Sequence, residues 1–251
     1  MTTEAAIEAV RHVNAVGTSP VVLVCEHAVA DIPGPYGDLG LSEAARLSHI
    51  AWDPGAAGVA RRLAAALDAR LVEGGVSRLI YDCNRPPEAP DAIPARSEIF
   101  DIPGNRALPD AERAHRIDTI YRPFHAALAE ALAARPNPVL VTVHSFTPIF
   151  DGHRRAEEIG IVHDTDSRLA DAMLADPPPG VAVARNRPYG PADGVTHTLR
   201  VHALGHRRPN VMLEIRNDLI ASEADQARMA GRLAPWLRTA MDALHLTEGR
   251  A

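Results

Sequence analysis

Residues 21–27 have the sequence VVLVCEH, a run of β-branched and apolar side chains that ends in two polar residues. A short apolar run of this kind predicts a buried β-strand. The same pattern returns in PVLVTVHSF (138–146) and NVMLEIR (210–216), so each run carries a histidine or a glutamate near its end. Because α/β enzymes place reactive side chains at the carboxyl ends of strands, these ends are the first candidates for a functional site.

Helical patterns alternate with these predicted strands. They predict helices over residues 41–50, 53–69, 109–134 with a kink near Pro123, 166–174, and 221–244 with an interruption at Pro235. Further strands are predicted at 70–72, 77–82, 158–162 and 181–184. The polar segment 88–106 is predicted to be a loop long enough to cover an active site. This alternation predicts a three-layer α/β/α fold with a mostly parallel, mixed central sheet.

The length of 251 residues predicts one domain over 1–251, with residues 1–18 as an N-terminal extension. The first ten residues contain two glutamates and no basic residue, unlike a secretory signal. No apolar stretch reaches the roughly 18 to 20 residues that a membrane span requires. We therefore expect a cytoplasmic protein that has no membrane partner.

The composition argues against several classes of protein. A net charge of −6 disfavours a nucleic-acid partner, which usually selects a basic surface. Two cysteines, Cys25 and Cys83, are too few for a disulfide framework. All 26 basic residues are arginines, so neither a Schiff-base lysine nor a P-loop lysine is available.

Four polar residues are candidates for a metal-dependent hydrolytic site. His27, His144 and Glu214 follow apolar strands, and Asp53 with Pro54 suits the N-cap and first position of a helix. In a mainly parallel sheet these positions share one edge. A catalytic zinc site often uses two imidazoles and one carboxylate, with a position left for water. The pattern therefore predicts His27, Asp53 and His144 as ligands and Glu214 as general base.

Spacing alone leaves other interpretations open. The chain has 12 histidines, and a role as helix cap also explains Asp53, so ordinary structural roles remain about as favoured as a metal centre. Glu26 is the rival for the carboxylate ligand. Cys25 beside Glu26 and His27 suggests a cysteine nucleophile instead. Because neighbouring strand residues point to opposite faces, a buried and unreactive thiol is the favoured interpretation.

Eight segments in order resemble the N-formylglutamate amidohydrolase family over nearly the whole chain after residue 20. They are CEH (25–27), WDPGA (52–56), SRLIYDCNRP (77–86), IPGN (102–105), YRPFH (121–125), TVHS (142–145), NRPYG (186–190) and NVMLEIRNDL (210–219). The resemblance implies a fold related to zinc carboxypeptidases and a divalent metal such as zinc. It also implies hydrolysis of the amide bond of a small N-acyl amino acid such as N-formyl-L-glutamate.

A more distant similarity to zinc-dependent muramoyl-alanine amidases implies the same roles for the candidate residues. Carried over by position, it assigns the metal to His27, Asp53 and His144 and the general base to Glu214. These are the residues that the strand-end argument also selects.

The resemblance also implies residues that bind substrate. Asn84 and Arg85 resemble the pair by which zinc carboxypeptidases hold a substrate carboxylate, and a planar guanidinium suits that contact. An ion pair of Arg85 with Asp82 or with a loop carboxylate is the alternative. Arg78 and Arg187 are further substrate-binding candidates.

The chain departs from the family pattern at two places. Val29 and Ala30 follow Ala28 where the family commonly continues Glu-His-Ala-Ser-Asn, and residues 142–145 are TVHS where Asp-x-His-Ser is common. These changes leave the identity of the substrate open. The alternatives are an amidase for another N-acylated amino acid or a cell-wall peptide, and a metal-free relative that only binds a carboxylate compound. The oligomeric state is not determined by the sequence.

Overall fold

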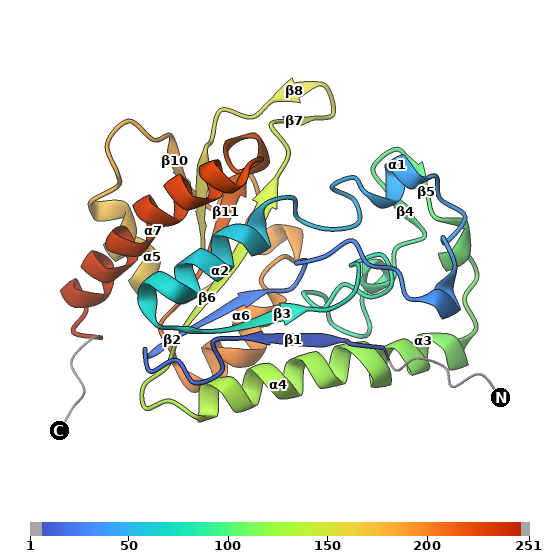
Figure 1. Ribbon diagram of the computed structural model, residues 1–251, viewed down its shortest axis with the longest axis horizontal. Helices are drawn as coiled ribbons and strands as arrows, with labels where there is room; N and C mark the ends of the chain where they lie inside the picture. Colours follow the sequence, from blue (N-terminus) through green and yellow to red (C-terminus); the bar gives the residue numbers. More distant parts are fainter. Residues whose placement is uncertain (1–6, 247–251) are drawn as a thin grey trace.

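A computed structural model describes residues 7–246 and shows a seven-stranded sheet between two layers of helices (Figure 1). The strand order is β1-β3-β2-β6-β11-β9-β10. In chain order these are β1 (Val10–Val13), β2 (Val21–Cys25), β3 (Arg70–Gly74), β6 (Val139–Phe146), β9 (Ile159–Val162), β10 (Val183–Arg185) and β11 (Asn210–Arg216).

The centre of the sheet is parallel and its margins are mixed. Strands β3, β2, β6 and β11 run parallel, whereas β1 is antiparallel to β3 and β9 is antiparallel to β11. Strand β10 pairs parallel with β9. The predicted three-layer fold with a mostly parallel, mixed sheet is therefore confirmed. The segment expected to be an N-terminal extension contributes the edge strand β1.

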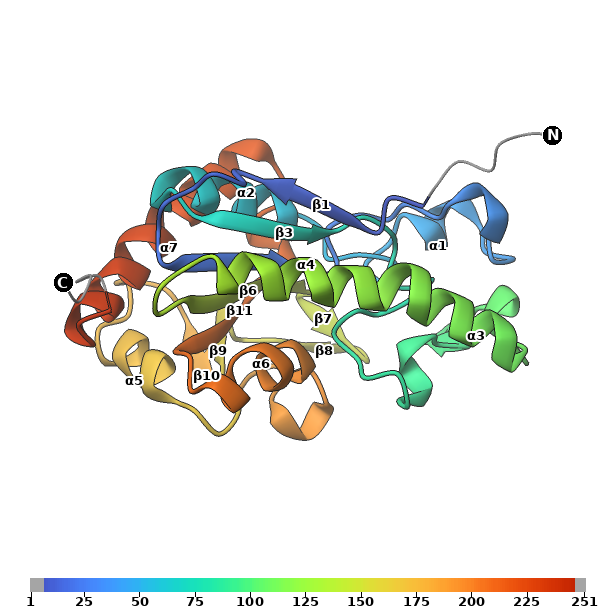
Figure 2. The ribbon, with the colours of Figure 1, turned by 90° about the horizontal axis from the view of Figure 1, so that it is seen from below.

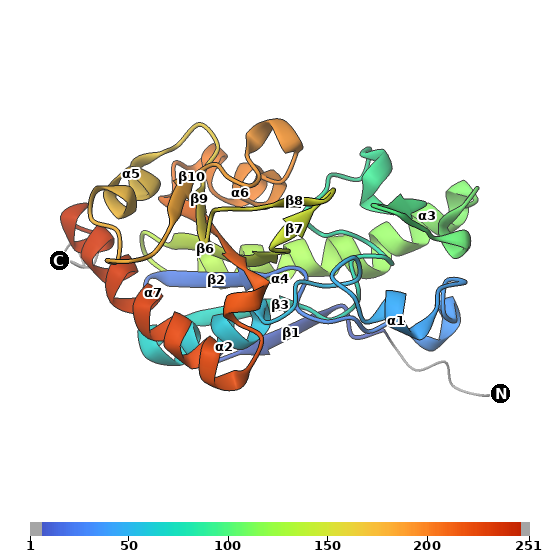
Figure 3. The ribbon, with the colours of Figure 1, turned by 90° about the horizontal axis from the view of Figure 1, so that it is seen from above.

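Helices cover both faces of the sheet. On one face lie α2 (Ala56–Leu67), α5 (Arg168–Ala175) and α7 (Glu223–Ala243) (Figure 3). On the other lie α4 (Arg122–Ala133) and α6 (His197–His202) (Figure 2). Strand β2 serves both cores, because alternate side chains point to opposite faces: Leu23 packs with α2 and α7, and Val24 with the α4 side. Within residues 7–246, no helix is both long and apolar enough to cross a bilayer.

The helices differ from the sequence-based expectations in their bounds. The kink expected near Pro123 is a π-helical turn over Ile117–Tyr121 that joins α3 (Asp110–Arg116) to α4. The interruption expected at Pro235 is wrong, because α7 is continuous through it and buries Leu233 and Leu237 on either side. The helix expected over 41–50 shrinks to one turn, α1 (Glu43–Arg46).

The strand predicted at 77–82 is wrong, and the segment is a buried loop. Ile80 donates its N–H to the Ser77 carbonyl at 2.9 Å, and Asp82 donates its N–H to the Ala92 carbonyl at 2.8 Å. The Ser77 hydroxyl donates to the carbonyl of Ala51 at 2.8 Å. The apolar residues of this segment are therefore buried with turn and loop hydrogen bonds in place of a strand ladder.

Two small hairpins project from the layers. The segment 88–106 is mostly irregular, as predicted, and carries β4 (Arg96–Ser97) and β5 (Phe100–Asp101). The second hairpin, β7 (Ile149–Phe150) and β8 (His153–Arg154), follows β6 and extends beyond the sheet at the top of Figure 1. Short 3-10 turns lie at Gly34–Tyr36, Pro90–Ala92, Pro103–Asn105, Pro191–Asp193, Leu204–His206 and Asn217–Leu219.

Candidate metal and catalytic site

Four chain segments bring the predicted site residues to one edge of the sheet. His144 in β6 and Glu214 in β11 are directly paired in the parallel register. His27 lies two residues past the end of β2, the other neighbour of β6. Asp53 belongs to the loop before α2, and its N–H donates to the carbonyl of His27 at 2.9 Å. The strand-end prediction is therefore correct in placing these four residues together.

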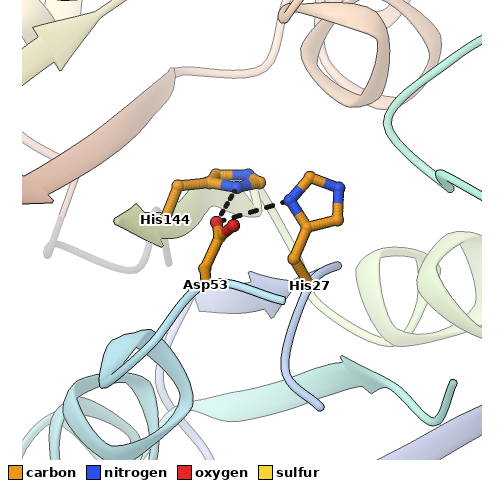
Figure 4. A group of neighbouring side chains, drawn as sticks. All are labelled: His27, Asp53 and His144. Carbon is orange, nitrogen blue, oxygen red and sulfur yellow. Dashed lines mark hydrogen bonds and ion pairs between the residues drawn. The ribbon is translucent and has the colours of Figure 1, made fainter. Parts of the chain in front are cut away.

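Asp53 is the centre of a compact group with the two histidines (Figure 4). Its Oδ2 lies 2.8 Å from His144 Nδ1 and 3.3 Å from His27 Nδ1. The same oxygen accepts a hydrogen bond from the N–H of Ser145 at 3.2 Å. One potential ligand atom from each of His27, Asp53 and His144 lies within 4.8 Å of the other two, and all three residues are buried.

The expectation that Asp53 caps the following helix is wrong. Helix α2 begins at Ala56, and its N-cap is Gly55, whose φ of +82° lies in the left-handed region that glycine tolerates. A Cβ at Gly55 would also come within 2.4 Å of the carbonyl oxygen of Ile220. This turn separates Asp53 from the helix end, so its carboxylate is directed to the histidines.

Each histidine has a second carboxylate at its other ring nitrogen. His27 Nε2 lies 2.7 Å from Asp82 Oδ1, and His144 Nε2 makes an ion-pair contact of 3.1 Å with Glu26 Oε2. Glu26, the rival ligand, thus contacts the side of His144 that faces away from Asp53. The sequence predicts Asp82 only as a partner for Arg85, and its position in the DCNR segment is the one signal for the contact with His27.

The carboxylates control the protonation of the two histidines. Burial alone would lower the pKa of His144, but Glu26 and Asp53 hold it well above the usual value. Burial and the charge of Arg78 both lower the pKa of His27. Asp82 and Asp53 outweigh them, so the pKa of His27 is raised. Burial opposes ionisation of Asp53, yet the two histidines lower its pKa. The site therefore favours the protonated form of the two histidines and the ionised form of the carboxylate between them.

Glu214 has a different environment. It is buried, and its Oε2 has no hydrogen-bond partner among residues 7–246. Burial, together with the charge of Asp53, raises its pKa to about 7, although His144 acts in the opposite direction. Its register partner in β9 is Gly160, where a Cβ would lie 1.9 Å from the carbonyl oxygen of Arg187. Glu214 can accordingly exchange a proton near neutral pH.

These groups open into a cavity of about 710 Å³. The lining includes His27, Asp53, His144 and Glu214 as well as Arg78, Asn84 and Arg85. Arg187 does not line it. The Arg187 side chain is 72% exposed and lies 3.5 Å from Glu157.

Three of the substrate-binding candidates already have partners in the structure. Arg78 donates to Asp82 at 2.6 Å and lies 3.5 Å from Asp53. Arg85 pairs with Asp91 at 2.7 Å, which agrees with the alternative of a loop carboxylate. The Asn84 side chain donates to the Val195 carbonyl at 2.6 Å and accepts from the Thr198 N–H at 3.0 Å. Asn84 therefore ties its loop to α6, a helix that the sequence did not predict.

Cys25 does not take part in the site. It is fully buried in the core formed with α2 and α7. Burial, with a further contribution from Asp53, raises the pKa of its thiol well above the usual value. Because the thiolate is the reactive form, Cys25 is an inert core residue and the cysteine-nucleophile alternative fails.

Both the sequence and the fold of this chain are similar to those of known proteins. The sequence model for N-formylglutamate amidohydrolase matches residues 19–221. The crystal structure of gene product Atu2144 from Agrobacterium tumefaciens is 52% identical, has a TM-score of 0.93, and each chain covers 98% of the other. N-formylglutamate amidohydrolase from Ralstonia eutropha JMP134 shares the fold, with 20% identity, a TM-score of 0.69, and coverage of 95% of this chain and 99% of that one. A search of curated proteins finds no significant match.

Proposed function

This chain belongs to the N-formylglutamate amidohydrolase family, and we propose that it is a metal-dependent amidohydrolase that acts on N-acyl amino acids, with N-formyl-L-glutamate as the first candidate. The observation that carries the proposal is the group His27, Asp53 and His144 beside Glu214 in one cavity. Two imidazoles, one carboxylate and an adjacent proton acceptor are the components of a hydrolytic zinc site.

The chemistry of the donor atoms fits a divalent metal. His27, Asp53 and His144 would hold it, because both imidazoles present Nδ1 to the same carboxylate. Their Nε2 atoms face Asp82 and Glu26. Metal-binding histidines commonly use the second nitrogen in this way, since an outer carboxylate sets the tautomer and the ring orientation. This arrangement favours Asp53 over Glu26 as the ligand.

The protein groups supply the proton transfer and the positive charge. When bound, a divalent metal such as zinc lowers the pKa of a water molecule and polarises the amide carbonyl. Glu214 then accepts the proton of the attacking water and delivers it to the leaving amine, for which a pKa of about 7 is suitable. Arg78, held between Asp53 and Asp82, provides positive charge for the developing oxyanion.

The 82–85 loop supplies a contact for a substrate carboxylate. Arg85 lines the cavity, and a guanidinium can meet a carboxylate with two parallel hydrogen bonds. Asn84 holds this loop against α6 through both ends of its amide. We therefore assign the carboxylate contact to Arg85 and a supporting role to Asn84.

Metal analysis and hydrolysis assays test this function together. The purified protein is expected to contain a divalent metal, to release formate from N-formyl-L-glutamate, and to lose activity reversibly on chelation. Glu214→Gln should retain the metal and lower kcat by about 10²- to 10⁴-fold, the usual contribution of a general base. Undiminished activity in that variant, or after complete metal removal, would contradict the mechanism.

A substrate panel separates the remaining alternatives. N-formyl, N-acetyl and peptidyl amides of glutamate, glutamine and alanine would be compared by kcat/KM. A preference for peptidyl amides would indicate a cell-wall peptide substrate. Tight binding without hydrolysis of any member would support the metal-free binding protein.

A further inference from the structure

Arg155 lines the cavity, and contacts with several side chains hold its guanidinium in place. Its guanidinium carbon lies 4.6 Å from the ring centre of Phe150, 4.9 Å from that of Tyr189 and 5.4 Å from that of Phe146. Its Nη2 donates to the Tyr189 hydroxyl at 2.9 Å. Its Nη1 donates to the carbonyl and the hydroxyl of Thr147 at 3.2 and 3.3 Å. The side chain is therefore fixed by aromatic faces and by neutral hydrogen-bond partners.

The charge of Arg155 is not balanced by a carboxylate. Arg78 and Arg85 line the same cavity, but they form ion pairs with Asp82 and Asp91. Throughout residues 7–246, no carboxylate lies within ion-pair distance of Arg155, and neither its Nε–H nor the second N–H of Nη2 has a partner. A cation that is held in place and left with unused donors is suited to binding an anion.

Tyr189 connects Arg155 to the reacting groups. Burial raises the pKa of its hydroxyl, so the ring stays neutral near pH 7 and does not cancel the arginine charge. The charges of Glu214 and Arg78 also influence this hydroxyl. Tyr189, Arg155 and Arg78 line the same cavity as Glu214, the proposed catalytic base.

We propose that Arg155 determines specificity by binding the side-chain carboxylate of an N-acylated acidic amino acid. This inference rests on the proposed amidohydrolase function, and it divides the two negative charges of the substrate between two walls. Arg85, on the 82–85 loop, receives the α-carboxylate, and Arg155, beside the β7–β8 hairpin, receives the side-chain carboxylate. An N-acyl amino acid with a neutral side chain would leave Arg155 without its anion.

The test compares N-formyl-L-glutamate with N-formyl-L-glutamine, in which a neutral amide of similar size replaces the side-chain carboxylate. Arg155→Met should lower kcat/KM for the glutamate compound by about 10- to 100-fold, the value of hydrogen bonds to a charged group. For the glutamine compound it should change kcat/KM by less than about 3-fold. Arg155→Lys should recover part of the loss, since it restores the charge without the planar fork.

Two control variants complete the comparison. Arg154→Met removes an exposed positive charge that lines the same cavity but lacks the aromatic and hydrogen-bond contacts of Arg155, and it should leave the preference for glutamate unchanged. Arg85→Met should weaken hydrolysis of both compounds equally, because both have an α-carboxylate. A wild-type rate of Arg155→Met on the glutamine compound would also show that the variant is folded.

Three results would overturn the assignment. They are an equal loss on both compounds in Arg155→Met, no loss on either compound, and an equal change of preference in Arg154→Met. Failure of the proposed function is a separate outcome, in which the wild-type protein hydrolyses neither compound.

Discussion

The protein contains two groups of buried histidines that have opposite electrostatics. In the site, His27 and His144 each lie between two carboxylates, and their pKa values are raised. Between α4 and α6, His125 Nδ1 lies 2.7 Å from His202 Nε2, and His125 Nε2–H donates to the carbonyl of Cys83 at 2.9 Å. No carboxylate within residues 7–246 makes an ion pair with this second group.

The pKa values follow from these partners. Burial and the neighbouring His125 lower the pKa of His202 to about 3 and that of His197 to about 4. Burial also lowers the pKa of His125. Buried imidazoles thus stay neutral where carbonyls and other imidazoles surround them. Carboxylates instead prepare them for a cation, whether a proton or a metal ion.

The second group, His125, His197 and His202, which we call the neutral group, supports a loop of the site. His125 in α4 and His202 in α6 are stacked, with ring centres 5.0 Å apart, and His197 lies 2.9 Å from the hydroxyl of Tyr121. Figure 2 shows these two helices on the same face of the sheet. Because His125 donates to Cys83, the residue before Asn84, the group supports the 82–85 loop that enters the cavity.

Asp53→Ala should have the largest effect, because it acts on the histidines that lie between carboxylates. It removes the carboxylate shared by both site histidines, so we expect loss of bound metal and of activity. The decrease should exceed the roughly 10- to 100-fold effect of an outer partner. Metal content measured by mass spectrometry provides the readout. His202→Gln serves as the matched control and should retain full metal stoichiometry; metal loss in both variants would show that only folding was affected.

Asp82→Asn should have a smaller effect on the same property. Its carboxylate contacts His27 Nε2, so its loss is expected to weaken metal affinity by about 10- to 100-fold. Competition with a chromophoric chelator measures this directly, without relying on activity. Asp171→Asn, a change at an exposed carboxylate of α5, should leave affinity unaltered. If Asp82→Asn bound metal with the affinity of the wild type, the proposed role of Asp82 in supporting His27 would be contradicted.

The smallest effect is expected from a change in the neutral group, and it concerns the pH dependence of the free energy of unfolding. The pKa of His202 is about 3 in the folded protein and about 6.5 in an unfolded chain. Between those values the unfolded chain binds the additional proton, so the free energy of unfolding falls as the pH falls from 6.5 towards 4. Replacing His202 with Gln should make this decline shallower.

Urea unfolding of the metal-free protein at several pH values measures that slope. His206→Gln, a change at an exposed histidine four residues away, should keep the wild-type slope. If His202→Gln and His206→Gln gave equal slopes, the neutral group would not be the origin of the acid sensitivity.

Part of the site was predictable because strands leave a strong pattern in sequence. The apolar runs before His27 and around His144 and Glu214 have the length and β-branched content of buried strands. Parallel pairing then places their polar ends together, as the register of β6 and β11 confirms. Asp53 lies beside both histidines as predicted, but the predicted helix cap at Asp53 is wrong, because Gly55 takes that position.

Other features were not predictable because burial can occur without a regular period. Leu79, Ile80 and Tyr81 resemble a strand in sequence, yet they are buried in a loop. Arg155 was not predictable as part of the site, because Tyr189, the hydrogen-bond partner that joins it to the rest of the cavity, lies 34 residues away. Contacts of this kind depend on which loops pack against each other in the folded chain, and the spacing of apolar residues does not predict that.

By itself, the sequence determined the layered α/β fold, and it predicted that His27, His144 and Glu214 lie together at one edge of the sheet as candidate site residues. These follow from local patterning that hydrophobic burial imposes on strands. Only the tertiary structure decided that Asp53 faces both Nδ1 atoms while Asp82 and Glu26 occupy the outer positions. The direction of a side chain depends on the backbone turn that carries it, here at Gly55, and on neighbours brought together by folding.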